Sequence, residues 1–223
     1  DGDSITQSDV VNIANTSSGA LTFQDDGPTL TVSGNAGAAA ALALTLDETA
    51  GATDRYAVGE THDTAVLDDA TGTVARQSTV IVGGLSSLFT IDASTGADGG
   101  TLATGGTLSL QLVGATAGKV GTNLSTVDGG AVSLEMSGSD VVGKDTAGHT
   151  VLSISVVSNQ LQVTLLEPLN HGTDGSTAYD EGLTLWTTGT NTALQLKYEV
   201  TQTDGDGDSI TQSDVVNIAN TSS

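Results

Sequence analysis

The stretch that decides the fold spans residues 194–218 and reads LQLKYEVTQTDGDGDSITQSDVVNI. Its first part alternates apolar and polar residues, which is the period-two pattern of a half-buried strand. Its centre, residues 204–208, holds three aspartates separated by glycines, and both residue types are common in turns. A second strand-like run follows at residues 210–218. The stretch therefore predicts an antiparallel hairpin with three carboxylates at its tip.

An identical block occurs at both ends of the chain. Residues 1–18 and residues 206–223 both read DGDSITQSDVVNIANTSS, so each residue recurs 205 positions later. A period of this length corresponds to a whole domain rather than to one coil of a solenoid. We interpret the chain as one unit of a tandem array. Residues 25–223 would form a single domain, and residues 1–24 would be the final strand of the preceding repeat plus a linker.

The composition limits the classes of partner and of stabilising link. Among 223 residues, 37% are hydrophobic but only 3% are aromatic, so the core must be built mainly from aliphatic side chains. The formal net charge of −22 disfavours binding to nucleic acid and to anionic lipid surfaces. There is no cysteine, so bound calcium is the natural substitute for disulfides in this acidic chain. No apolar run is long enough to predict membrane insertion.

Short strands separated by turns are predicted along most of the chain, and no helix is predicted. The predicted strands are residues 29–32, 41–46, 79–82, 88–91, 108–112, 132–136, 154–156, 161–165, 183–185, 194–200 and 210–218. Residues 34–40 and 96–106 are expected to be loops, Ser158 and Asn159 to form a tight hairpin turn, and Trp186 to pack in the core. The pattern favours an all-β fold, an antiparallel Ig-like β-sandwich elaborated with long loops.

Acidic residues gather in three segments that such a sandwich would place at one end. These segments are the hairpin tip, the linker before the first strand, and the turn after the second strand. Their carboxylates are Asp25, Asp26, Asp47, Glu48, Asp204, Asp206 and Asp208. Calcium takes six to eight oxygen ligands, and a cation would relieve the repulsion among these groups. We expect calcium to bind here, and a solvated turn is the alternative.

Three segments resemble the repeats of giant type I-secreted RTX adhesins of Gram-negative bacteria. They are LTFQDDGPTLT at 21–31, LTLDETAG at 44–51 and YEVTQTDGDGDSIT at 198–211. The resemblance implies an Ig-like extender domain on the extracellular bacterial surface. Such a domain holds a distal ligand-binding region away from the cell, and calcium stiffens its junctions. It implies that Asp25, Asp26, Asp204, Asp206 and Asp208 carry the junction motif.

Other residues raise alternatives that the sequence supports less well. His62 with Glu60 and Asp63 could bind a transition metal. His171 lies close in sequence to Glu167, Asp174, Asp180 and Glu181, an arrangement that could cleave a glycoside. We favour a second calcium at Asp174, Asp180 and Glu181 over catalysis, and a solvated loop over both. No nucleophile has a visible base, so we predict that the chain is not an enzyme.

Two function classes remain open. The first is a structural spacer whose partners are adjacent identical repeats in the same chain. The second is a repeated module that binds glycans or another surface through avidity. We expect the isolated unit to be a monomer that can exchange its duplicated strand.

Overall fold

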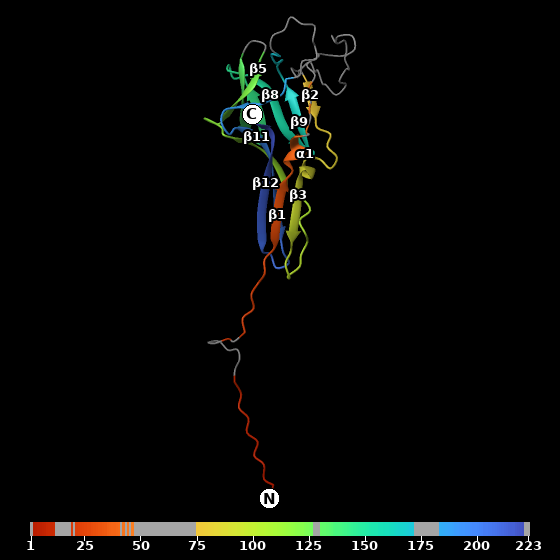
Figure 1. The fold of residues 1–223 in the computed structure, drawn as a ribbon, viewed down its shortest axis with the longest axis vertical. Helices are drawn as coiled ribbons and strands as arrows, with labels where there is room; N and C mark the ends of the chain where they lie inside the picture. The colour runs from red at the N-terminus through yellow and green to blue at the C-terminus, as the bar shows by residue number, and fades with distance from the viewer. Residues whose placement is uncertain are drawn as a thin grey trace.

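Strands make up most of the chain that the computed structural model describes (Figure 1). It describes residues 2–11, 19, 21–40, 42, 44, 46, 75–126, 130–171 and 183–220. The strands are β1 Thr29–Gly34, β2 Ala75–Ser78, β3 Phe89–Ser94, β4 Thr107–Val113, β5 Lys119–Ser125, β6 Ala131–Ser137, β7 Asp140–Lys144, β8 Thr150–Val157, β9 Gln160–Leu165, β10 Thr187–Thr188, β11 Ala193–Thr203 and β12 Ser209–Asn220. Two short helices, α1 Ala36–Ala40 and the 3₁₀ helix η1 Leu85–Leu88, lie between them.

All the paired strands run antiparallel and form three sheets. The largest has the order β10-β5-β6-β7-β8-β9-β2, the second has the order β12-β11-β4, and the third is the pair β1-β3. The predicted all-β antiparallel class is therefore confirmed. The Ig-like arrangement of the strands stays a prediction.

The core lies where the sheets face each other. β4 packs against β6, β7 and β8, and β1 packs beside β12. Leu134, Leu194 and Leu196 are completely buried, and most of the other core side chains are aliphatic. The rings of Phe89 and Tyr198 add one tilted aromatic contact, with centroids 5.2 Å apart. This core agrees with the low aromatic content of the sequence.

Both predicted hairpins lie where the sequence placed them. Ser158 and Asn159 join β8 to β9 with φ values of 50° and 61°, the left-handed region that a two-residue turn of this kind requires. β11 and β12 pair along their length from Ala193 with Asn220 to Thr203 with Ser209. The aspartate-rich stretch thus connects two long paired strands.

The predicted absence of helix is wrong at α1, which occupies the expected loop at residues 34–40. Asn35 caps this helix, because its side-chain Oδ1 accepts the N–H of Ala38 at 3.0 Å and its carbonyl accepts the N–H of Ala39 at 3.0 Å. Alanine has the highest helix propensity, and Ala39 is buried. A cap and one buried contact are enough to form a single turn.

Two predicted strands, at residues 41–46 and 79–82, are absent from the residues of these segments that the structure describes. Leu42, Leu44 and Leu46 lie outside any strand, and the N–H of Leu42 bonds to the carbonyl of Ala39, which continues the turn from α1. Residues 79–82 lie beyond the end of β2. There the side-chain Oε1 of Gln160 accepts the N–H of Ile81 at 3.2 Å. The partner of this N–H is thus a side chain, whereas in a strand it would be a backbone carbonyl of the neighbouring strand.

The prediction for residues 183–185 and Trp186 is also wrong. The side chain of Asn123 donates to the carbonyl of Thr184 at 2.9 Å and accepts the N–H of Trp186 at 2.7 Å, and strand β10 begins only at Thr187. Trp186 is 39% exposed rather than buried in the core. Among the described residues, no helix has the length and apolar character needed to cross a membrane.

Candidate metal centre

The tip of the β11–β12 hairpin is built around the side chain of Asp204. Its Oδ1 accepts the backbone N–H groups of Gly207 and Asp208 at 3.0 and 2.8 Å. Its own N–H donates to the carbonyl of Asp208 at 3.0 Å. Aspartate favours such side-chain-to-backbone turns, so one of its oxygens is used to shape the loop.

Two glycines let a second loop approach this tip. Gly100 forms an isolated bridge with Asp204 and has φ of 125°, a conformation that favours glycine. A Cβ atom on Gly205 would collide with the carbonyl oxygen of Asp98. The close approach brings the carboxylate of Asp98 to the hairpin tip.

Five carboxylates meet at this end of the domain. Ligand oxygens of Asp25, Asp206 and Asp208 lie within 4.8 Å of one another. Those of Asp98, Asp204 and Asp206 form a second such group, and Asp206 belongs to both. The structure thus brings together four of the predicted residues. It adds Asp98, which we did not predict, although its position in the glycine-rich segment GADGG was a signal of a tight turn.

Of the three remaining predicted ligands, the structure describes only Asp26. Asp26 lies beside the group, and both of its carboxylate oxygens accept the N–H of Ala97, at 2.9 and 3.1 Å. It therefore fastens the linker to the loop that carries Asp98. Asp47 and Glu48 lie outside the described residues.

One oxygen at the centre of this group has no donor. Asp204 is 7% exposed, and its Oδ2 is buried without a hydrogen bond within the described part of the chain. A buried carboxylate oxygen without a partner is costly, because it has lost its water and gained nothing in return. A donor or a cation at this oxygen would remove that cost, and a protonated neighbouring carboxyl, a water molecule or a metal ion could each supply it.

The pKa values of the group reflect this competition. The pKa of Asp98 is raised by burial first, and then by the charge of Asp25 and a hydrogen bond with it. The pKa of Asp206 is raised first by a hydrogen bond with the Asp204 side chain. Burial raises the pKa of Asp204, but the hydrogen bond from Asp206 and backbone N–H donors outweigh it, so that pKa is lowered. The opposite shifts mean that, as the pH falls, Asp206 takes up a proton before Asp204.

All the ligand atoms offered here are oxygens. Carboxylates from three segments, with backbone carbonyls nearby, form the donor set that Ca²⁺ prefers, and they include no sulfur or imidazole for a softer metal. Asp25, Asp98, Asp204, Asp206 and Asp208 would hold the ion. Bound there, it would join the linker, the loop at residues 96–100 and the hairpin tip.

The stabilisation by calcium is expected to shrink in acid. Asp98 and Asp206 must lose their protons to bind a cation, and their pKa values lie above the ordinary 3.8. The protonated forms of these two residues stabilise the calcium-free fold below pH 3.8. This contribution to stability is lost as the pH rises through their folded pKa values. The effect of Asp204 on stability is the opposite. Its carboxylate stabilises the calcium-free fold at higher pH, and this contribution is lost as the pH falls through its lowered pKa.

Melting temperatures with and without calcium, at neutral pH and just above pH 3.8, measure this effect. We expect the difference between the two curves to be smaller at the acidic pH. A difference that is the same at both pH values would contradict proton competition at this site.

Comparison with protein families adds one match. A family model described as "Domain of unknown function (DUF5801)" matches residues 43–218. The chain belongs to this family. The DUF5801 match includes Asp98 and the hairpin tip, whereas Asp25 and Asp26 precede it. No curated protein and no solved structure matches the chain.

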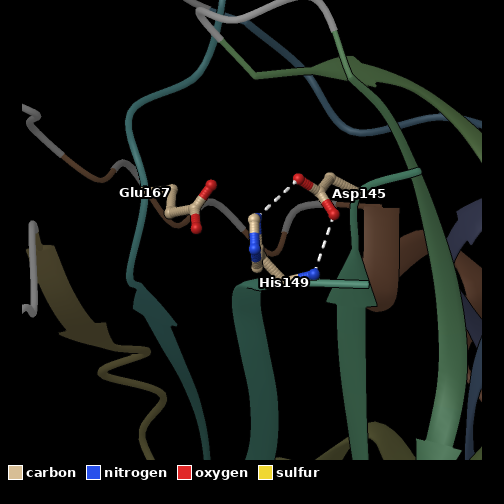
Figure 2. A group of neighbouring side chains, drawn as sticks. All are labelled: Asp145, His149 and Glu167. Atoms are coloured by element: carbon tan, nitrogen blue, oxygen red, sulfur yellow. Dashed lines mark hydrogen bonds and ion pairs between the residues drawn. The ribbon is translucent and has the colours of Figure 1, made fainter. Parts of the chain in front are cut away.

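A second group of side chains that could hold a metal ion in this DUF5801 domain lies where β7 ends, β8 begins and β9 ends. Figure 2 shows the ring of His149 between the carboxylates of Asp145 and Glu167. Asp145 accepts the N–H of His149 at 2.8 Å and lies 3.2 Å from its Nδ1. Burial raises the pKa of Asp145, but these His149 contacts and further backbone N–H groups outweigh it, so the pKa is lowered. Both oxygens of Asp145 thus close the β7–β8 turn.

The other predicted alternatives are only partly described. Glu60, His62 and Asp63 lie outside the described residues of this DUF5801 domain, as do Asp174, Asp180 and Glu181. His171 is exposed, and Glu167 belongs to the group around His149.

Proposed function

We propose that this DUF5801 domain is a spacer repeat of an extracellular adhesin on the bacterial surface. Calcium at the junctions between consecutive domains stiffens the array, which projects a distal ligand-binding region for adhesion and biofilm formation. The resemblance to RTX adhesin repeats and the identical block at residues 1–18 and 206–223 support this proposal. The domain has no catalytic role in it.

The observation that carries the proposal is the distance between the two ends of the domain. The linker arrives at the hairpin tip, where Asp25 meets Asp206 and Asp208. β12 begins beside the hairpin tip, and its 12 residues extend over roughly 36 Å at about 3.3 Å per residue. The end of β12 therefore lies about that far from the tip. In Figure 1 the linker meets the lower end of the domain. Copies joined in this way extend end to end, as a spacer requires.

The acidic group explains how an array of such domains would become stiff. Asp25 belongs to the linker, whereas Asp98 and Asp204 belong to the body of the domain. In the absence of a cation, these charges repel one another, while Asp26 holds the linker to the N–H of Ala97. A calcium ion bound to both sides fixes the direction in which the linker leaves the domain. The buried, unpartnered Oδ2 of Asp204 favours an ion there over a merely solvated turn.

A chain of three consecutive 205-residue units tests the proposal by small-angle X-ray scattering. We expect a longer maximum dimension in millimolar calcium than in EDTA, because fixed junctions keep the units in line. Asp25→Asn in every unit should remove the difference, and Asp140→Asn in every unit should preserve it. Sodium chloride at matched ionic strength controls for charge screening.

Two results would contradict the spacer proposal. One is a scattering curve that does not change with calcium. The other is specific binding of the single unit to a glycan array or to ice, which would favour a repeated binding module acting through avidity.

A further inference from the structure

The same sequence occupies two different environments in this chain. In β12, Val216 is 2% exposed and packs in the core. Its copy Val11, 205 positions earlier, is 83% exposed, and the neighbouring Val10 is 84% exposed. Residues 2–11 thus present the apolar side chains of a core strand to solvent.

The position of β12 in its sheet makes it replaceable. It lies at the edge of the order β12-β11-β4 and, among the strands that the structure describes, pairs only with β11. Removing an edge strand breaks one ladder of hydrogen bonds and leaves the other strands of the sheet paired. Residues 2–11 restore every side chain of residues 207–216, including Asp9 in place of Asp214, whose Oδ2 accepts the N–H of Gly34 at 2.7 Å.

The connection to β1 is long enough for the copy to reach this position within its own chain. If Val11 occupies the position of Val216, the chain must run from that position back along the strand to Asp25 at the hairpin tip. Val216 lies eight residues beyond Asp208, which is roughly 26 Å along the strand. The 14 residue steps from Val11 to Asp25 span up to roughly 46 Å.

We propose that the edge of β11 accepts residues 2–11 of the same chain in place of residues 207–216, so that the domain can form in two alternative frames. This inference does not depend on the spacer function or on calcium. A tethered segment competes at an effective concentration in the millimolar range, well above that of a second molecule in a dilute solution. The five-residue loop between β11 and β12 is the shorter closure, so residues 207–216 hold the position in the intact chain.

Matched substitutions at the two copies test the proposal on the full chain. Val216→Asp places a charged side chain at a buried core position of β12, and Val11→Asp makes the same change in the copy. We expect Val11→Asp to melt like the wild type. Val216→Asp should melt within about 5 °C of it, because the N-terminal copy takes over. The double variant should lose at least about 10 °C more, because neither copy can then fill the position.

Two outcomes would overturn the proposal. The first is that Val216→Asp alone is as unstable as the double variant, which means that the copy does not replace β12. The second is that Val216→Asp recovers stability only as its concentration rises and has the mass of a dimer in light scattering. That result would assign the replacing strand to a second molecule instead of the same chain.

Discussion

Asp204→Asn is expected to abolish the stabilisation by calcium while leaving the calcium-free domain folded. The Asn side-chain oxygen can still accept the N–H groups of Gly207 and Asp208, so the loop keeps its shape. The substitution also removes the buried charge at Oδ2. Ligand binding to the folded state alone adds about 2.7 kcal/mol at a hundredfold excess over Kd. For a domain of this size, that corresponds to a rise of roughly 5–10 °C in Tm.

Thermal unfolding in millimolar calcium and in EDTA measures both parts of this prediction. Asp140→Asn is the matched control, since it removes the same charge at the β6–β7 turn, away from the acidic group. An equal loss of the calcium response in both variants would mean that calcium acts only by neutralising the net charge. A calcium response that survives Asp204→Asn would place the ion elsewhere.

Gly205→Ala is expected to weaken calcium binding and to destabilise the domain together. The added Cβ would collide with the carbonyl oxygen of Asp98, which is backbone and cannot rotate away. The loop carrying Asp98 must then move, which separates two of the ligand groups. Overpacking of this kind typically costs about 1–3 kcal/mol.

A second glycine in the same region provides the control. A Cβ on Gly27 meets no atom within 4 Å, so Gly27→Ala should leave both the unfolding free energy and the calcium affinity nearly unchanged. Denaturant unfolding and calcium titration calorimetry measure the two quantities. An unchanged calcium affinity in Gly205→Ala would show that Asp98 is not a ligand.

The hairpin and its acidic tip could be predicted because both depend on local sequence. Alternating Leu194, Leu196, Tyr198 and Val200 face the core as the period-two pattern indicates, and the turn chemistry of aspartate and glycine sets the tip. Placing Asp25 at that tip also needed only the expectation that the first and last strands share one end.

Strands β5 and β7 could not be predicted because their pairing depends on distant residues. β5 contains Lys119, Gly121 and Asn123 among its apolar residues, and β7 has only five residues. Both lie inside the seven-stranded sheet, where neighbours on each side supply hydrogen bonds that the local pattern does not reveal.

Asp98 was missed for a similar reason. Its contribution depends on the close backbone approach at Gly100 and Gly205, two glycines that are 105 residues apart in the sequence. A single sequence shows that each is a turn residue but not that the two turns touch. The unpartnered Oδ2 of Asp204 is likewise a property of packing, since it follows from burial rather than from residue type.

Anomalous diffraction from crystals of the full chain grown with calcium tests the central claim most directly. The account predicts an anomalous peak about 2.3–2.6 Å from Oδ2 of Asp204, with ligand oxygens from Asp25, Asp98, Asp206 or Asp208 completing its shell. Ordered density for these side chains with no peak among them, and with Asp204 bonded instead to a protonated Asp206, would contradict it.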